Sequence, residues 1–281
     1  MIVDIHTHFF SPREISETLR ADMERCGIDP GVWDFTEEDY LRGTEGADFA
    51  AVFGIRAKAT GWSGDNEKIS AFAAKHKKLI FFASIDPAEK NFTEQLKYCH
   101  SKLKCKGVKL GPVYQNVHPH DKRYCEIYKY CEANGLPVIT HMAATFASGA
   151  YLEHARPILM DKVACDFPGL KIILAHMGHP WEGEAIAAIR KQPNLYADLS
   201  ALYYRPWQFY NAMRLAEEYG AYNKIFFGSD FPATTTRGSV EGINNKNEIV
   251  EGTGLPAVSK TMLDEIIYRD TLGILEIEPS K

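Results

Sequence analysis

Short apolar runs, rich in valine, isoleucine and phenylalanine, recur along the whole chain at the spacing of a strand–helix unit. Each run has the length and the β-branched and aromatic content of a buried strand. After the first gap, their starts lie roughly 24 to 34 residues apart, which is the length of one strand with its crossover helix. The runs are residues 1–8, 49–55, 79–86, 107–112, 137–141, 171–176, 195–200 and 224–230.

The segments between the runs carry helix start signals. Ser11, with Glu14 three residues later, predicts a capping box for a helix that ends near Gly27. Asp65 is expected to cap a helix after the second run. Asp121 ends an HPHD stretch and is interpreted as a helix cap, with a metal ligand as the alternative.

Eight strand–helix units in 281 residues predict an α/β fold, a (β/α)8 TIM barrel that occupies residues 1–281 as a single domain. The alternative is an open doubly wound sheet, which would normally carry a glycine-rich phosphate turn after its first strand, and the sequence has none there. The longest insertion, residues 9–47, follows the first strand. Because Trp33, Phe35 and Tyr40 lie in it, we expect an ordered lid over the mouth of the barrel.

Composition argues against several classes of protein. The formal net charge is −5 without a long Lys/Arg run, so we expect no nucleic-acid partner. No uninterrupted apolar stretch reaches the roughly 18 residues of a membrane span, and the N-terminal residues lack a signal-peptide pattern. The six cysteines form no CxxC pair, which is typical of reduced thiols. A cytoplasmic protein that acts on a small molecule, with no membrane partner, is therefore expected.

Polar side chains capable of binding a metal end several of the predicted strands. In the first run, Asp4, His6 and His8 stand at every second position, so all three are expected on one face of the strand, which should be apolar. His141, His176 and Asp230 end later runs. The carboxyl ends of all strands of a (β/α)8 barrel meet on one face, so these side chains should share one cavity.

This mixture of imidazoles and carboxylate suits Zn²⁺, with Mn²⁺ or Fe²⁺ as alternatives. Three histidines and one aspartate would leave positions open for water and substrate. A single buried histidine is usually a hydrogen-bonded core residue, but a whole set at strand ends would carry roughly 1–3 kcal/mol of uncompensated burial per group. Asp4 lies one pleat deeper and is expected to orient a ligand or to accept backbone hydrogen bonds.

The order of these motifs resembles the amidohydrolase superfamily, and within it the amidohydrolase-related branch that contains aminocarboxymuconate-semialdehyde decarboxylase. The resemblance implies that His6, His8, His141 and Asp230 bind one divalent metal. It also implies that His176 acts beside the metal as general acid/base or electrostatic partner, with Asp230 as proton shuttle. The motifs are VDIHTH (3–8), GVKLGP (107–112), GLPVITH (135–141), LAHMGHPW (174–181), YADLS (196–200) and FGSDFP (227–232).

Lys109, near the end of the fourth run, leaves two alternatives open. Superfamily members with two metals use a carboxylated lysine on this strand as a bridge, whereas one metal is the rule in the branch that this chain resembles. With one metal, Lys109 would bind an anionic group of the substrate. Three further residues are candidates for substrate binding: Arg56 as a carboxylate clamp, His179 where the family often has glycine, and Trp181 as part of an aromatic wall.

The sequence predicts a metal-dependent hydrolase that acts on a small carboxylated molecule through metal-activated water. Asp230 would take the proton and His176 would stabilise charge on the substrate oxygen. The same residues would also serve a non-oxidative decarboxylase, in which protonated Asp230 delivers a proton to carbon, or a hydratase. A barrel that binds a ligand without turnover is a further alternative, and the resemblance implies a homodimer by analogy.

Overall fold

Eight parallel strands form one sheet in the computed structural model, which describes residues 1–279. Neighbouring strands follow the order β1-β2-β5-β6-β7-β8-β9-β10, and each lies within one of the eight apolar runs, so the predicted TIM barrel is confirmed. A two-residue hairpin, β3 (Arg56–Ala57) with β4 (Trp62–Ser63), follows β2. The barrel strands are β1 (Val3–His8), β2 (Phe49–Phe53), β5 (Leu79–Ser84), β6 (Gly107–Leu110), β7 (Val138–Thr140), β8 (Ile172–Leu174), β9 (Leu195–Asp198) and β10 (Ile225–Phe226).

The first and last strands meet and complete the barrel. Just past β10, Asp230 N donates to His6 O at 2.8 Å, and His8 N donates to Phe231 O at 2.8 Å. This seam places the two histidines of β1 beside the segment that carries Asp230.

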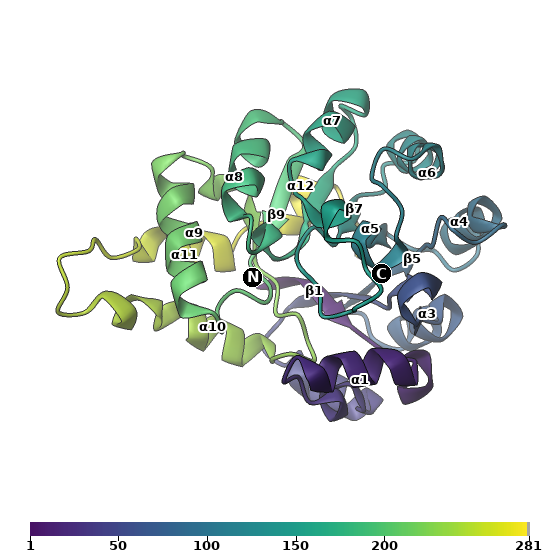
Figure 1. The fold of residues 1–281 in the computed structure, drawn as a ribbon, viewed down its shortest axis with the longest axis horizontal. Coiled ribbons are helices and arrows are strands. Elements are labelled where there is room, and N and C mark those ends of the chain that lie inside the picture. Colours follow the sequence, from purple (N-terminus) through teal and green to yellow (C-terminus); the bar gives the residue numbers. More distant parts are fainter. Residues whose placement is uncertain (280–281) are drawn as a thin grey trace.

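Helices surround the strands on all sides (Figure 1). The α-helices are α1 (Glu17–Arg25), α2 (Glu37–Gly43), α3 (Asn66–Ala74), α4 (Phe92–Ser101), α5 (Pro112–Gln115), α6 (Lys122–Ala133), α7 (Leu159–Asp166), α8 (Glu182–Lys191), α9 (Pro206–Glu218), α10 (Thr236–Asn244), α11 (Lys260–Ile267) and α12 (Thr271–Leu275). Single 3-10 turns are η1 (Pro12–Glu14), η2 (Pro30–Trp33), η3 (Lys58–Thr60), η4 (Leu152–Ala155), η5 (Ala175–Gly178), η6 (Tyr222–Lys224) and η7 (Lys246–Val250). Within the described residues, no helix is long and apolar enough to span a bilayer.

Alternate residues of the strands feed two apolar clusters. One cluster fills the layer between the strands and the helices, and the other fills the barrel interior. Phe53, Phe82 and Ile173 belong to the interior cluster, together with Leu272 and Leu275 of α12. Burying each such side chain contributes about 1.5–3 kcal/mol to the free energy of unfolding. The interior is therefore packed with apolar side chains at its amino end.

The helix-cap predictions at Asp65 and Asp121 are confirmed. The Asp65 carboxylate accepts hydrogen bonds from the first turn of α3, and the Asp121 carboxylate accepts one from Arg123 N of α6. Residue Gly135, just past α6, has φ +63°, the left-handed conformation expected of a glycine that stops a helix.

The predicted helix start at Ser11 is wrong. Ser11 donates its hydroxyl to the Glu14 carboxylate at 2.7 Å, but it precedes only the single turn η1 and its side chain makes no hydrogen bond to the backbone there. Ile15 is extended and pairs with Trp62 as an isolated β-bridge, which interrupts the helix. Ser16 is the residue that caps α1, where its hydroxyl accepts a hydrogen bond from Leu19 N.

The insertion between β1 and β2, residues 9–47, folds into η1, α1, η2 and α2. The Trp33 ring lies 5.4 Å from that of Phe10 and 5.6 Å from that of Trp62. Tyr40 is fully buried beside Thr7, whose hydroxyl lies 2.5 Å from the phenol oxygen. The insertion is thus ordered by aromatic packing against the carboxyl end of the barrel.

Candidate active site

A β-bulge in β1 determines which of its side chains enter the barrel. The pairing with β2 shifts register between Asp4 and Thr7, so β1 has one residue more than its partner strand there. After the bulge, His6 and His8 project into the barrel, where their rings lie 5.0 and 4.9 Å from the ring of Phe53. The extra residue reverses the alternation. The expectation that Asp4 shares the face of the two histidines is therefore wrong.

Asp4 instead ties β1 to the segment that follows β10. Its Oδ1 accepts a hydrogen bond from Ser229 N at 2.8 Å, and its Oδ2 accepts one from Thr236 Oγ1 of α10 at 2.7 Å. Burial raises the pKa of this carboxyl to about 6, although the hydrogen bonds lower it. The expected role of Asp4 as an acceptor of backbone hydrogen bonds is confirmed, and it fixes the residue next to Asp230.

Three of the four predicted ligands converge at the carboxyl ends of β1 and β10. His6 Nε2 lies 3.2 Å from His8 Nε2, and Asp230 Oδ1 lies 3.5 and 3.3 Å from these two nitrogens. Asp230 has φ +63°, a conformation that a non-glycine residue adopts only where its surroundings hold it there. We call His6, His8 and Asp230 the ligand cluster; such a group of atoms can hold a metal ion.

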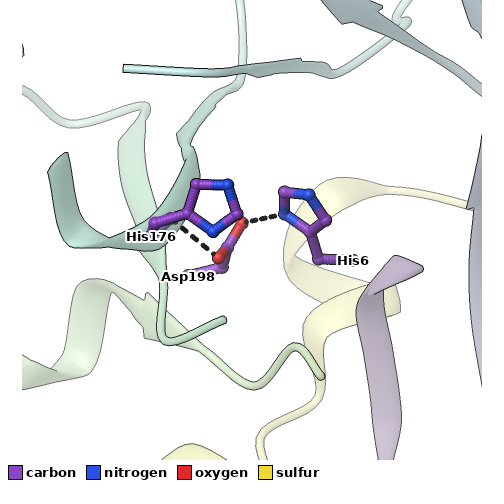
Figure 2. A group of neighbouring side chains, drawn as sticks. All are labelled: His6, His176 and Asp198. Carbon is purple, nitrogen blue, oxygen red and sulfur yellow. Dashed lines mark hydrogen bonds and ion pairs between the residues drawn. The ribbon is translucent and has the colours of Figure 1, made fainter. Parts of the chain in front are cut away.

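Asp198, at the end of β9, orients His6 from behind. Its Oδ2 lies 2.9 Å from His6 Nδ1, and its Oδ1 accepts a hydrogen bond from the backbone N of His176 at 3.0 Å (Figure 2). The same Oδ1 also accepts from Ser200 N at 3.1 Å. With its lone pairs used in this way, Asp198 accepts the Nδ1 proton of His6 and leaves the Nε2 lone pair directed at the ligand cluster.

The imidazoles of the site are held in the form that binds metals. Burial keeps the pKa of His6, His8, His141 and His176 well below the usual value, and the charge of Lys109 lowers it further. Neutral imidazole is the ligand form of histidine. His6 Nε2 and His8 Nε2 are then acceptors that face the Asp230 carboxyl, whose pKa burial raises to about 8. A proton on Asp230, or a positive charge beside the three groups, satisfies such an arrangement.

His141, the fourth predicted ligand, is not part of the ligand cluster in the described structure. Its Nδ1 lies 3.1 Å from His176 Nε2, and its Nε2 lies 3.4 Å from Ala144 O. β7 and β8 are neighbours, so His141 and His176 meet at their ends. The His176 ring in turn lies 4.6 Å from that of His6, so His176 stands between His141 and the ligand cluster.

Lys109 is fully buried beside the ligand cluster. Its Nζ lies 3.2 Å from His6 Nε2 and 4.8 Å from the centre of the Phe53 ring. Burial lowers the pKa of Lys109 to about 8, while the carboxylates of Asp198 and Asp230 raise it. The structure thus places Lys109 beside the ligand cluster, although it is not among the residues that line the cavity described below.

The ligand cluster opens into a cavity of about 780 Å³. His8, His141, His176 and Asp230 form part of its wall. Aromatic rings form much of the remainder, contributed by Trp33, Trp62, Tyr114, Phe146, Tyr203 and Tyr204.

Of the three further residues predicted to bind substrate, His179 reaches the cavity, whereas Arg56 and Trp181 do not. His179 lines it, and burial lowers the pKa of its imidazole to about 4, with a further contribution from Arg205. Arg56 donates to both carboxylate oxygens of Glu89, at 2.7 and 3.0 Å, and is not among the lining residues. Trp181 packs under the guanidinium of Arg156, also outside the cavity.

Sequence reasoning missed Asp198 and Arg205. Asp198 stands at the end of the seventh apolar run, within YADLS, and the strand-end rule that found Asp230 would have found it too. Arg205 lies in an irregular loop before α9 and lines the cavity, but no periodicity marks it. The HPHD histidines, by contrast, form no metal-binding group within residues 1–279.

A family model described as Amidohydrolase matches residues 3–258. The chain belongs to this amidohydrolase family. The resemblance inferred from the six motifs is thereby confirmed at the level of the family. No match was found among curated protein sequences.

Solved structures with the same barrel fold include several members of the superfamily. An uncharacterised TIM-barrel protein from Bordetella bronchiseptica has a TM-score of 0.73 and 20% identity, with 98% of each chain covered. A dihydroxybenzoic acid decarboxylase from Polaromonas sp. JS666, with bound manganese and 2-nitroresorcinol, has a TM-score of 0.66 and 14% identity over 98% of this chain and 96% of that chain. A probable 2-pyrone-4,6-dicarboxylic acid hydrolase from Acinetobacter baumannii has a TM-score of 0.64 and 15% identity over 98% and 99%.

Proposed function

We propose that this amidohydrolase-family protein is a divalent-metal-dependent enzyme that removes carbon dioxide from a small carboxylated ring compound. The observation that carries the proposal is that the ligand cluster opens into a cavity walled by aromatic rings. Flat apolar walls with a few polar groups at one end suit an aromatic or unsaturated ring that bears a carboxylate.

His6, His8 and Asp230 would hold the metal, with Zn²⁺ first and Mn²⁺ as the alternative. Two neutral imidazoles and a carboxylate are the donor set that these ions accept, and the contact between Asp198 and His6 Nδ1 leaves Nε2 free to bind. When bound, the metal would supply Lewis acidity toward a substrate oxygen. A single metal agrees with the fact that the two groups of possible ligands, His6/His8/Asp230 and His6/His176/Asp198, share His6. Lys109, whose Nζ lies 3.2 Å from His6 Nε2, would then serve an anionic group at the metal rather than bridge a second metal.

Asp230 is the acidic residue of the cavity wall, which makes it the group to hold and pass a proton. In the proposed reaction the bond between the ring carbon and the carboxylate carbon breaks, and its electron pair stays on the ring carbon. Asp230 delivers its proton to that carbon as carbon dioxide leaves. His176, oriented by the Ser200 hydroxyl at 2.7 Å from Nδ1, stabilises charge on a neighbouring substrate oxygen.

Hydrolysis, the first expectation from the sequence, is the second candidate. The same cavity would admit a cyclic ester with carboxylate substituents, the kind of substrate named for the structurally similar probable hydrolase. In that reaction ionised Asp230 would accept a proton from water, and His176 would stabilise the developing oxyanion. We place decarboxylation first because the cavity walls favour a flat ring and because the similar structures named for a reaction are mostly decarboxylases.

We further propose that residues 9–47 act as the lid of this site. Cys26, Ile28, Val32 and Trp33, all from this insertion, line the cavity. By covering the ring of the substrate they would exclude water, which favours proton delivery to carbon over hydrolysis. The cytoplasmic location and the homodimer stay predictions.

The test is a product assay with protein loaded with Zn²⁺ or Mn²⁺. Hydroxybenzoates, muconate semialdehydes and pyrone carboxylates are offered in turn, and both released carbon dioxide and ring-opened acid are measured. Carbon dioxide release that stops with Asp230→Asn supports the proposal. Ring opening without carbon dioxide would replace it by hydrolysis, and a blank panel with metal-loaded protein would favour binding without turnover.

A further inference from the structure

Two cationic side chains on the cavity wall have no acidic partner. Arg205 and Lys246 both line the cavity, and neither forms an ion pair within residues 1–279. The other arginines near the carboxyl end of the barrel are committed to carboxylates: Arg56 to Glu89 and Arg156 to Glu184. A free guanidinium at a cavity wall is therefore a distinguishing feature of this site.

The guanidinium of Arg205 is held in place but keeps most of its donors unused. It stacks on the Tyr204 ring at 4.6 Å, and Nη1 donates to the carbonyl of Ala201. An arginine carries five N–H donors in a planar fork that matches a carboxylate. Its charge also reaches His179 on the same cavity wall, where it adds to the lowering of the imidazole pKa that burial causes.

Lys246 approaches the same cavity from another direction. It starts η7, the turn that follows α10, and η7 packs against α9, the helix that Arg205 precedes. Burial lowers the pKa of Lys246, while the nearby Glu248 carboxylate raises it without forming an ion pair in the described structure. Asp230, already assigned to the ligand cluster, is the acidic residue that shares this wall.

We propose that Arg205, assisted by Lys246, binds a second carboxylate of the substrate, so that the natural substrate is a dicarboxylate. This inference rests on the proposed function, which places the first, reacting carboxylate at the ligand cluster. The aromatic walls hold the ring between the two ends, and Arg205 takes over the role of carboxylate clamp that the sequence assigned to Arg56. Arg205 is a specificity-determining residue and takes no part in bond breaking.

The experiment compares two unreactive probes by titration calorimetry on the metal-loaded protein: isophthalate, with two carboxylates, and benzoate, with one. We expect isophthalate to bind at least about tenfold more tightly than benzoate. This factor is the lower end of the contribution that one charge-assisted hydrogen-bonded pair makes to binding. In Arg205→Gln this preference should fall below about threefold while the benzoate affinity stays unchanged. Arg205→Lys, which keeps the charge, should retain part of the preference, and Lys246→Gln should reduce it less than Arg205→Gln does.

Arg190→Gln is the matched control, because Arg190 also stacks on a tyrosine, Tyr219 at 5.3 Å, but lies outside the cavity. It should leave both affinities unchanged, and circular dichroism should show every variant folded. Equal affinities in the unmodified protein, or an equal loss for both probes in Arg205→Gln, would overturn the inference. Because binding is measured without turnover, a dicarboxylate preference that depends on Arg205 supports the inference even if no carbon dioxide is released. If carbon dioxide is released but the affinity for isophthalate does not depend on Arg205, the second carboxylate site is ruled out and the proposed function still stands.

Discussion

At the amino end of the barrel interior, Phe82, Ile173 and Leu275 of α12 belong to one cluster of buried apolar side chains. At the carboxyl end the same sheet surrounds His6, Lys109 and Asp230, all largely or fully buried. The first end contributes free energy of folding by removing apolar surface from water. The second end costs free energy, because titratable groups are desolvated there. The comparison teaches that the barrel is stabilised at one end and can therefore carry an unfavourable cluster of polar groups at the other.

The largest expected effect is a loss of activity without a loss of stability, after substitution of a residue at the carboxyl end of the barrel. Asp230→Asn should lower turnover by about 10²–10⁴-fold, because it removes the group that carries the proton and one metal ligand. The fold should persist, since the change is isosteric. Steady-state kinetics beside circular dichroism measures both quantities, with Asp264→Asn on α11 as the control. Full activity in Asp230→Asn would count against the whole assignment.

A substitution at the amino end of the barrel should instead lower the stability of the protein and leave its metal content unchanged. Leu275→Ala removes a fully buried side chain from the interior cluster and should lower the free energy of unfolding by about 2–5 kcal/mol. Urea denaturation measures this loss. The metal content per chain, by elemental analysis, should not change, because the ligand cluster lies at the opposite end. A variant that lost its metal while still folded would show that the two ends are not independent.

Asp198→Asn tests the support of the ligands rather than the ligands themselves. The amide cannot accept the Nδ1 proton of His6 with the strength of a carboxylate, so the imidazole loses its fixed orientation. We expect metal affinity to fall by about 10–100-fold, measured by competition with a chromophoric chelator. An unchanged affinity would mean that the other contacts of His6 suffice to hold it.

The smallest effect concerns acid sensitivity. Burial lowers the pKa of His179 to about 4, so between pH 4 and the usual 6.5 the unfolded chain binds more protons than the folded one. Stability contributed by neutral His179 is therefore present above pH 6.5 and lost as the pH falls toward 4. From pH 7 to 5, the unmodified protein should lose about 1–2 kcal/mol more than His179→Gln does in urea denaturation. Leu275→Ala should show the same pH dependence as the unmodified protein.

The strands and most of the site were predictable because both follow local rules. Apolar runs mark buried strands, and a polar residue at the end of such a run marks the carboxyl face of the barrel, which located His6, His8 and Asp230. The bulge after Asp4 was not predictable, because the bulge depends on pairing with β2 and leaves no pattern in β1 itself.

The side-chain contacts that form between distant parts of the chain likewise could not be predicted from the sequence. Arg56 has the charge of a substrate clamp, yet its Nη2 donates to both carboxylate oxygens of Glu89 and its Nη1 donates to Gly64 O. His141 ends its strand as predicted, but which imidazole it faces depends on the order of strands around the barrel. Such pairings are chosen by geometry across the fold, and no spacing along the chain encodes them.

The seam between β1 and the segment after β10 also has a consequence for synthesis on the ribosome. The backbone hydrogen bonds that join His6 and His8 to Asp230 and Phe231 connect two segments that lie far apart in the sequence. The segment with the two histidines is therefore made long before the segment that pairs with it. The ligand cluster consequently forms only on a chain whose barrel has already closed.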